Sequence, residues 1–195
     1  MKLTEKLPDS IIVDGKRVRV NLEFRNVLRM MEIMQDDCLI HDARMYKAAK
    51  CVVKGRVRQP ERVISELKKL LFPKARHASS KRLTSYEQDA GFIRAAFRQV
   101  YGIDLWREKL HWLEFRELLD GLTEGNKYTE VIGIRARDIP APTKYNHKEI
   151  EWLMEAKSIY ALELTEEERM EQYDRDVKKV FNVLFSFAGS GDNGK

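Results

Sequence analysis

The sequence predicts a mainly α-helical protein, a helical bundle with a short N-terminal β-hairpin. Most of the chain places apolar residues at intervals of three and four, the spacing that puts them on one face of a helix. A strand pattern around a turn signal is found at residues 11–20. Short connections between the helical segments favour antiparallel packing of neighbouring helices.

The composition is that of a soluble globular protein. The 195 residues are 43% hydrophobic and 34% charged, which fits one domain, or one domain plus an appended helix. No run approaches the roughly 18–20 apolar residues that cross a bilayer. The N-terminal stretch MKLTEKLPDS lacks the apolar segment of a secretory signal. We therefore expect no membrane association and residence in a cytoplasm.

Residues 11–20 (IIVDGKRVRV) form the predicted hairpin. The dipeptide Asp14-Gly15 lies between two β-prone runs and suits a tight turn, because both turn residues adopt positive φ. In the second strand, Arg17 and Arg19 alternate with two valines. A lone hairpin is marginally stable in water, so this one must pack against the helices or pair with another segment.

Three amphipathic helices are predicted next, at residues 24–34, 41–53 and 60–71. Pro60 suits the first turn of the third helix. The polar, basic residues 73–85 that follow are expected to form an exposed linker. Methionine is common on adaptable binding surfaces, but core packing is the favoured role here. The apolar residues of the three helices are Phe24, Val27, Leu28, Met31 and Met34; Met45, Ala49, Val52 and Val53; and Val63, Ile64, Leu67, Leu70 and Leu71.

The stretch 86–121 organises the rest of the chain as two helices separated by Gly102. Ser85 and Gln88 have the spacing of a capping box at the start of the first helix. Gly102 can take the left-handed conformation that ends a helix, and Asp104 is a candidate N-cap for the next one. The apolar face of the first helix consists of Tyr86, Ala90, Ile93, Phe97, Val100 and Tyr101.

The second helix of this pair is predicted to be the centre of the bundle. Its apolar residues cover most of its circumference, and such a helix is normally buried on several sides. We expect the other helices to pack around it. These apolar residues are Trp106, Leu110, Trp112, Leu113, Phe115, Leu118, Leu119 and Leu122.

Further helices are predicted in the last third of the chain. Tyr128, Val131, Ile132 and Ile139 indicate a short helix that ends at the sequence IPAP. The spacing of Asn146 and Glu149 indicates the start of a second helix, and the spacing of Thr165 and Glu168 indicates the start of a third. The second helix is lined by Ile150, Leu153, Ala156 and Tyr160, and the third carries the stripe Met170, Tyr173, Val177, Val180, Phe181 and Leu184.

No catalytic residue, cofactor site or metal site is predicted, and the chain is not expected to be an enzyme. The spacing of the histidines does not match a helical zinc site, and neither a phosphate-binding glycine loop nor a nucleophile motif is present. His111 fits a hydrogen-bonded core or boundary residue better than a catalytic base. Cys38 and Cys51 fit reduced residues better than a disulfide or a metal site.

Positive charge is concentrated in residues 44–82, where 13 Lys and Arg residues stand against Glu61 and Glu66. The whole chain carries a net charge of only +5. A solvated face, or a landing surface for an acidic protein, is favoured over phosphate contacts to nucleic acid, because the segment has few aromatic residues for base stacking. The candidate electrostatic partner surface consists of Lys68, Lys69, Lys74, Arg76, Lys81 and Arg82.

Several motifs occur together in a distinctive order. Asp89-Ala90 and Ala95-Ala96-Phe97 precede YGIDL at 101–105, which precedes Leu110-His111-Trp112 and Phe115. This combination resembles the gene-product-fifteen family of tail proteins from siphophages of Gram-positive hosts. The opening LTEKLPDSIIVDGKRVRV and later residues, including Lys127-Tyr128 and Arg135, match as well. The family-motif core consists of Phe97, Tyr101, Gly102, Ile103, Asp104, Leu105, Leu110, His111, Trp112 and Phe115.

The resemblance covers roughly residues 3–162 and implies a domain organisation. Residues 1–162 would form a tail-assembly-chaperone-like helical domain that includes the hairpin. Residues 163–188 would form a C-terminal amphipathic helix packed on, or extending, the bundle. Residues 189–195 would be a flexible tail. Leu113 departs from the family, which often shows a second tryptophan at this place.

The resemblance implies a non-catalytic tail assembly chaperone in the cytoplasm of the infected bacterial host. Such a protein would bind and solubilise the long helical tape-measure protein until tail-tube subunits assemble around it. The tape-measure protein is therefore the expected partner, with the tail-tube protein and a second copy of this chain as further partners. The alternatives are a structural tail or connector subunit of the virion and, less favoured, a nucleic-acid-binding accessory protein.

Overall fold

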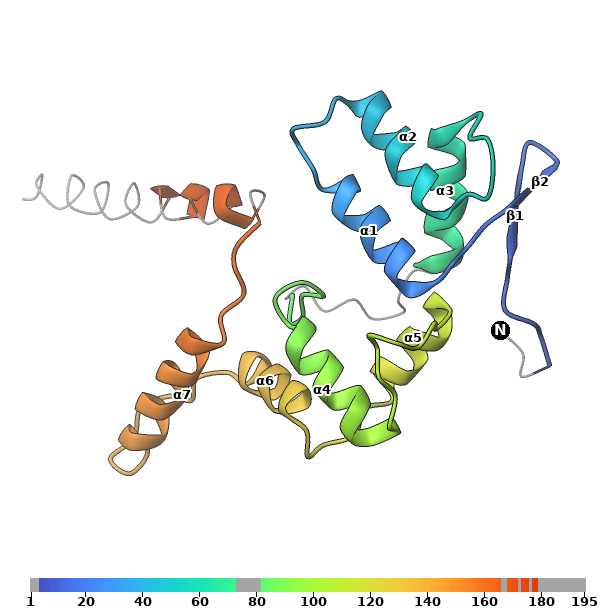
Figure 1. Cartoon of the computed structure of the whole chain (residues 1–195). Helices are drawn as coiled ribbons and strands as arrows, with labels where there is room; N and C mark the ends of the chain where they lie inside the picture. Colours follow the sequence, from blue (N-terminus) through green and yellow to red (C-terminus); the bar gives the residue numbers. More distant parts are fainter. Residues whose placement is uncertain (1–3, 73–81, 166–167, 172, 176, 179–195) are drawn as a thin grey trace, which may run out of the picture.

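A computed structural model of the chain shows two groups of helices with a β-hairpin beside the first group (Figure 1). The structure describes residues 4–72, 82–165, 168–171, 173–175 and 177–178. The predicted fold class, mainly α with a short N-terminal hairpin, is confirmed. In chain order the elements are β1 (Ser10–Val13), β2 (Lys16–Arg19), α1 (Phe24–Met34), α2 (His41–Val52), α3 (Pro60–Leu71), α4 (Ala90–Tyr101), α5 (Trp112–Asp120), α6 (Lys127–Ala136) and α7 (His147–Ile159).

The hairpin forms around the predicted turn, in which Asp14 and Gly15 have φ values of 48° and 73°. The strands β1 and β2 pair in an antiparallel manner across this turn. Val20, just after β2, bridges Val53 at the end of α2, and Arg62 of α3 forms an ion pair with Asp14. These contacts supply the support that an isolated hairpin lacks.

The helices α1, α2 and α3 follow the predicted ranges closely and pack together next to the hairpin (Figure 1). Pro60 occupies the first turn of α3, where its missing N–H group costs nothing. The apolar residues predicted to face inward are buried or half-buried. Met31 and Met34 are only half-buried, whereas Met30, just before Met31, is buried.

The helix predicted from residue 86 begins later, at Ala90, and its capping differs from the prediction. The Ser85 N–H group donates to Oδ2 of Asp89 (2.9 Å), so Asp89 takes the role expected of Gln88. The Gln88 N–H group donates to Oγ of Ser85 (3.3 Å). At the other end, Gly102 has a φ of 69° and forms the predicted left-handed C-cap.

The second helix of the pair is shorter than predicted. Oδ1 of Asp104 accepts a hydrogen bond from the Trp106 N–H group (3.0 Å), so Asp104 closes a turn and does not begin a helix. The helix α5 begins only at Trp112, with His111 as its N-cap. Trp106 therefore lies outside the helix and is 73% exposed, which corrects its predicted burial.

A short antiparallel contact replaces the missing helical turns and joins the two groups of helices. The Phe24 N–H group donates to the Leu110 carbonyl (3.0 Å), and the Trp112 N–H group donates to the Leu22 carbonyl (2.7 Å). Phe24 and Trp112 are the first residues of α1 and α5, where N–H groups have no partner within the helix. The contact satisfies both helix starts at once, and residues 108–110 lie outside any helix.

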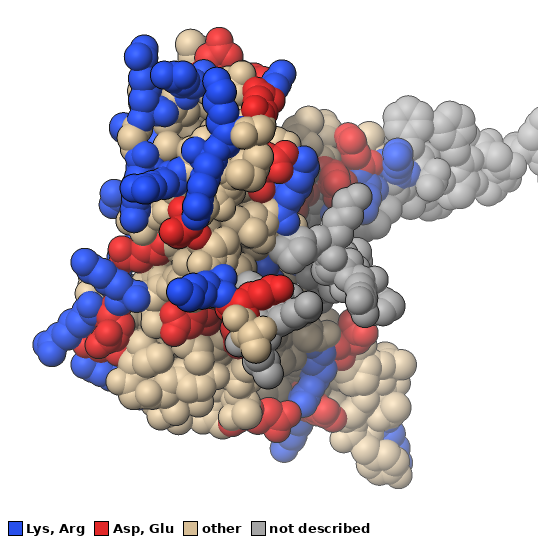
Figure 2. Space-filling view, turned by 90° about the vertical axis from the view of Figure 1, so that its right-hand side faces the viewer, with Lys and Arg blue, Asp and Glu red and all other residues tan. Residues whose placement is uncertain are grey.

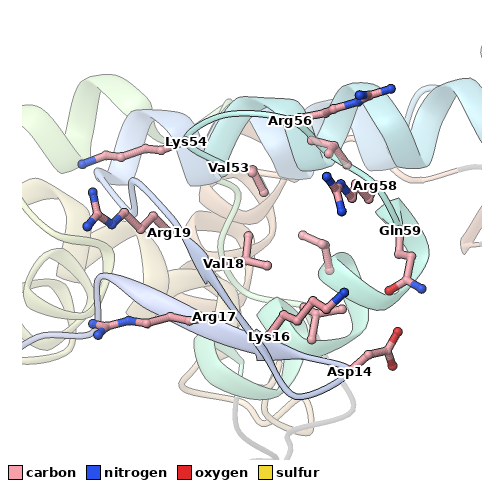
Figure 3. Close-up of a pocket in the computed structure, with 13 residues that line it drawn as sticks. Asp14, Lys16, Arg17, Val18, Arg19, Val53, Lys54, Arg56, Arg58 and Gln59 are labelled. Carbon is pink, nitrogen blue, oxygen red and sulfur yellow. The ribbon is translucent and has the colours of Figure 1, made fainter.

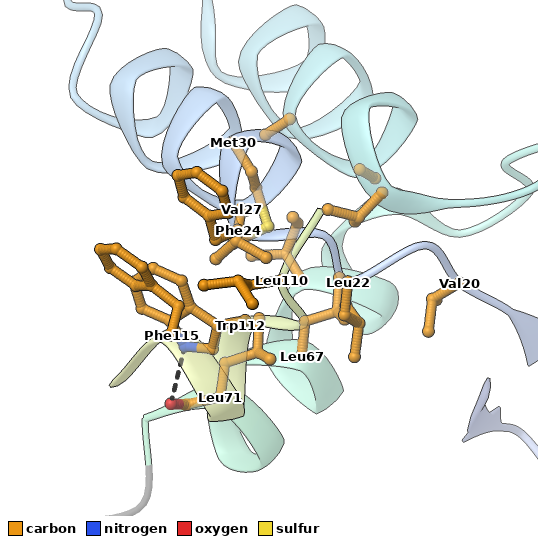
Figure 4. Close-up of a cluster of buried hydrophobic side chains, with 14 of the residues drawn as sticks. Val20, Leu22, Phe24, Val27, Met30, Leu67, Leu71, Leu110, Trp112 and Phe115 are labelled. Atoms are coloured by element: carbon orange, nitrogen blue, oxygen red, sulfur yellow. Dashed lines mark hydrogen bonds between the residues drawn. The ribbon is translucent and has the colours of Figure 1, made fainter. Parts of the chain in front are cut away.

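Trp112 lies within the largest hydrophobic cluster and is fully buried (Figure 4). Its ring packs against those of Phe115, Phe72 and Tyr86, with centroid separations of 5.8, 5.6 and 5.7 Å. Nε1 of Trp112 donates a hydrogen bond to the Leu71 carbonyl at the end of α3 (3.4 Å), drawn as a dashed line in Figure 4. The predicted burial of Trp112 is therefore confirmed, but the prediction that the other helices pack around this helix is wrong, because α5 packs mainly against α1, α4 and the end of α3.

A buried ion pair fastens α6 to the start of α4. The guanidinium of Arg135 donates to both carboxylate oxygens of Asp89, each at 2.8 Å, and the two residues are 9% and 1% exposed. Arg135 also donates to the carbonyl groups of Leu83 and Tyr160 (2.9 and 2.6 Å). One side chain thus connects α6 to the start of α4, to the segment just before it and to the end of α7.

The helices α6 and α7 differ slightly from the predictions. α6 ends at Ala136, before Ile139, which lies beyond the helix and is 49% exposed. α7 begins at the predicted place, but Oδ1 of Asn146 accepts a hydrogen bond from the Thr143 N–H group (2.7 Å) in the preceding loop. Asn146 therefore organises the loop and does not cap the helix.

The segment after α7 leads away from the helical body (Figure 1). Thr165 and Glu168 form the predicted capping box, with reciprocal bonds of 2.9 and 3.2 Å between each N–H group and the other side chain. Residues 168–171, 173–175 and 177–178 are helical. The stripe residues Met170, Tyr173 and Val177 are exposed, whereas Val180, Phe181, Leu184 and residues 189–195 lie outside the described residues.

Replacing Trp112 by alanine should lower the free energy of unfolding by about 3–5 kcal/mol, because the change opens a cavity in the middle of the cluster. Trp106→Ala is the matched control: its ring is 73% exposed, so we expect a change within about 0.5 kcal/mol. Urea denaturation followed by circular dichroism measures both values. Equal stability of the wild type and Trp112→Ala would contradict the position of Trp112 in the core.

Arg135→Met should cost about 3–5 kcal/mol, because it leaves the Asp89 carboxylate buried without its partner. The double variant Asp89→Leu/Arg135→Met should lose less, since no buried charge remains. The same denaturation experiment compares the two variants. A double variant less stable than Arg135→Met would show that the unpaired charge is not the main cost.

Candidate partner-binding surfaces

The family-motif residues lie mostly in the core, where they position the surfaces of the molecule. Tyr101 donates its hydroxyl hydrogen to the Leu118 carbonyl (2.8 Å) and so ties α4 to α5. Nδ1 of His111 accepts a hydrogen bond from the Leu113 N–H group (3.2 Å), and its Nε2 lies 3.1 Å from the Pro8 carbonyl. Five motif residues are buried, namely Phe97, Leu105, Leu110, Trp112 and Phe115, while Ile103 and Asp104 are half-buried.

The predicted electrostatic surface is only partly described. Lys74, Arg76 and Lys81 lie outside the described residues. Lys68 and Lys69 are exposed in the last turn of α3, where Nζ of Lys69 lies 2.6 Å from the Glu66 carboxylate.

Arg82 is engaged within the chain. Its guanidinium donates to both carboxylate oxygens of Glu168 (3.2 and 2.9 Å) and to the Glu163 carbonyl. These hydrogen bonds from Arg82 hold the pKa of Glu168 below its usual value. Arg82 thus anchors the segment after α7, and the described members of the predicted surface do not form one patch.

The structure instead brings a different set of cations together, in a cleft between the hairpin and the loop from α2 to α3 (Figure 3). The cleft has a volume of about 760 Å³. Figure 2 shows Lys and Arg side chains gathered on the upper part of the face that carries the hairpin. We call this site the basic cleft; its cations are Lys16, Arg17, Arg19, Lys54, Arg56 and Arg58, and its valines are Val13, Val18, Val53, Val57 and Val63.

Most cations of the basic cleft lack an ion-pair partner among the described residues. Arg17 pairs with Asp9 (3.1 Å), but the other five have no such carboxylate in the described part of the chain. The carboxylate that lines the cleft, Asp14, is already paired with Arg62. Like charges that are held together in this way create a positive potential, so the cleft attracts anionic groups.

Sequence reasoning identified both halves of the basic cleft but did not join them. The alternation in β2 and the basic loop at 54–58 were both visible. They come together because Val20 bridges Val53 and the Lys54 N–H group donates to the Arg19 carbonyl (2.9 Å). This is a long-range contact that local patterns do not encode.

An open apolar groove lies between α1 and α3, with a volume of about 430 Å³. We call it the methionine groove. Because Met31 and Met34 are half-buried, they contribute to this open surface as well as to packing, which revises their predicted role as core residues. The groove is lined by Met30, Met31, Met34, Ile64 and Phe72, together with Gln35 and Lys68.

A smaller apolar groove of about 220 Å³ is lined in part by Trp106. Its walls include Leu28 of α1 and Ile93 of α4. The guanidinium of Arg94 lies 4.6 Å from the centre of the Trp106 ring, a cation–π contact that steadies the exposed side chain. The exposed Trp106 ring therefore forms part of the wall of a groove and is not an isolated side chain on the surface.

His41, Asp42 and Glu61 form an exposed cluster, with one ligand atom from each lying within 4.8 Å of the others. The partner of His41 is Glu61, whose Oε1 lies 3.1 Å from Nε2 of the imidazole. The sequence pointed to neither Glu61 nor a cluster here. Exposed acidic groups of this kind are common without a metal, so no metal is assigned.

The geometry can be compared with known proteins. A family model described as bacteriophage Gp15 protein matches residues 3–162, from before the hairpin to beyond α7. No curated protein and no solved structure matches the chain. Within its described residues, no helix is both long and apolar enough to cross a membrane. The chain belongs to the bacteriophage Gp15 protein family, which points to a phage structural or assembly protein.

Proposed function

We propose that the protein is a non-catalytic tail assembly chaperone that binds the phage tape-measure protein and keeps it soluble during tail assembly. Family membership supports a role in building the phage particle. The methionine groove is the observation that favours a chaperone. An extended helical protein with exposed apolar stripes aggregates unless another surface covers those stripes.

The methionine groove suits an amphipathic helix. A helix can bury its apolar face in a groove between two other helices, with side chains at spacings of three and four entering it. Methionine side chains are unbranched and flexible, so Met31 and Met34 can adapt to different apolar residues. Adaptability fits a long partner whose successive segments are alike in pattern but not in sequence.

The size of the groove favours a reversible contact. At about 430 Å³ it can hold a few side chains, so one copy would cover a short segment of a helix. Many copies along one tape-measure protein would then act together, although each contact is weak. A coat of this kind can be displaced when tail-tube subunits assemble.

The described ionisable groups favour binding over catalysis. The basic cleft presents cations whose neighbouring carboxylate, Asp14, is already paired with Arg62. Both ring nitrogens of His111 have hydrogen-bond partners within the chain. Asp14 and His111 are therefore occupied with structure, and the unpaired cations of the basic cleft suit binding of an anionic partner.

A structural tail or connector subunit is the second candidate. The exposed stripe after α7 favours it, because Met170 and Tyr173 are 62% and 66% exposed and a permanent neighbour would cover them. The two roles differ in the fate of the chain. A chaperone leaves before the particle is complete, whereas a subunit stays.

Co-expression with the tape-measure protein encoded by the same phage tests the chaperone role. Wild-type chain should co-purify with the tape-measure protein and raise its soluble fraction. Met34→Lys places a charge in the methionine groove and should reduce both effects about tenfold or more, because a buried charge opposes apolar contact.

Met154→Lys is the matched control, since Met154 is 55% exposed on α7 and lies outside the groove. This variant should behave like the wild type, and circular dichroism should show that both variants are folded. Failure of the wild-type chain to co-purify with the tape-measure protein, or to raise its solubility, would contradict the proposed function.

A further inference from the structure

The edge of β2 that faces away from β1 is open at Arg17, along the basic cleft, and is covered further on by residues 52–54. The strand β1 takes the opposite edge, with Val13 facing Lys16 across the turn. In an antiparallel pair, every second residue of a strand directs its N–H and carbonyl groups toward its partner strand, and the residues between direct them to the other side. In this register, Arg17 and Arg19 direct their backbone groups away from β1. At Arg19 this edge is already taken by Lys54, whose N–H group donates to the Arg19 carbonyl (2.9 Å) next to the Val20–Val53 bridge. Among the described residues, the N–H and carbonyl groups of Arg17 have no backbone partner, so these two groups can pair with another extended segment.

The cations stand on both sides of this open edge. Arg17 and Arg19 come from the strand itself, and Arg56 and Arg58 come from the loop across the cleft (Figure 3). All four side chains are exposed, and Arg19, Arg56 and Arg58 have no ion-pair partner among the described residues. Acidic side chains on a strand added here would meet several cations at once.

The valines of the cleft favour a polypeptide over nucleic acid. Successive side chains of an extended strand point to opposite faces, so one set can contact Val18 and Val53 while the other meets the cations. Nucleic acid has no backbone amide groups to pair with β2. It would also find no aromatic ring among the residues that line the cleft, so its bases would have no stacking surface.

We propose that the basic cleft binds an extended acidic segment of a partner protein, which pairs as a short strand with the backbone of Arg17 at the open part of the β2 edge. Strand addition of this type takes affinity from backbone hydrogen bonds and specificity from alternate side chains. The complementary charges would speed the encounter and reject basic segments. This site is separate from the methionine groove, so it goes beyond the proposed function and does not rest on it.

The test uses the purified full chain and a fluorescently labelled peptide of about ten residues that alternates glutamate and valine, the pattern expected of the added strand. Fluorescence anisotropy should show binding that weakens as salt is raised. A peptide of the same sequence, N-methylated at alternate residues on its pairing edge, keeps its charge but loses hydrogen-bond donors. It should bind about tenfold more weakly, as expected when backbone pairing contributes to affinity.

Charge-reversal variants distinguish binding of the peptide in the basic cleft from general electrostatic attraction to the protein. Arg56→Glu/Arg58→Glu should weaken binding of the unmethylated peptide about tenfold or more. Lys144→Glu/Lys148→Glu changes the net charge by the same amount at exposed positions near the start of α7, and it should leave binding close to wild type. Because all four substituted residues are exposed, both double variants should fold, which circular dichroism verifies.

Three results would overturn the proposal. The N-methylated peptide could bind as tightly as its parent, which would mean that no strand is added. The control variant could lose as much affinity as the cleft variant, which would mean that the cleft is not the site. A DNA duplex of about 20 base pairs could bind more tightly than the peptide at the same salt concentration, which would assign the cations to phosphate contacts.

Discussion

Two backbone hydrogen bonds, inside a hydrophobic cluster shared by both sides, form the joint between the two groups of helices on which the other features depend. They run between residues 22–24 and 110–112 and satisfy the first N–H groups of both α1 and α5. They also bring the ring of Phe24 against that of Phe115, at a centroid separation of 4.8 Å. Nε1 of Trp112 also donates a hydrogen bond to the Leu71 carbonyl, which connects α5 to the end of α3. The relative positions of α1, α3 and α5 follow from this joint.

The apolar and charged surfaces of the protein follow from the same arrangement. Because α1 and α3 are both held by the joint, the methionine groove between them has a defined shape. The basic cleft depends on a second long-range contact, between Val20 and Val53, which sets the hairpin against the loop after α2. A molecule built in this way offers an apolar site and an electrostatic site at different places.

The local features were predictable from the sequence where neighbouring residues determine them. The Asp14-Gly15 turn, the left-handed Gly102 cap, Pro60 at the start of α3 and the Thr165–Glu168 capping box all depend on a few adjacent residues. The prediction of a helix that begins at Asp104 was wrong because a distant segment, and not the neighbouring residues, determines the structure there. Helical propensity there is overridden by pairing with residues 22–24, far away in the chain, which leaves Trp106 at the surface.

The candidate surfaces were harder to predict than the fold. Counting charges indicated a basic region, but it could not show that Arg82 is bound to Glu168 or that Arg17 and Arg56 face one cleft. The pairing of Asp89 with Arg135 was likewise hidden, although both residues were noticed as parts of motifs. Which charges are paired and which are free is a property of tertiary structure, and it decides which of them can bind a partner.

The central claim is that this chain covers an apolar partner for a limited time and then departs. Quantitative mass spectrometry of infected-cell extracts and of purified phage particles tests it most directly. The account predicts that the chain is abundant in extracts, in complexes that contain the tape-measure protein, and absent from mature particles. Its presence in mature particles at a fixed ratio to the other tail proteins would contradict the account.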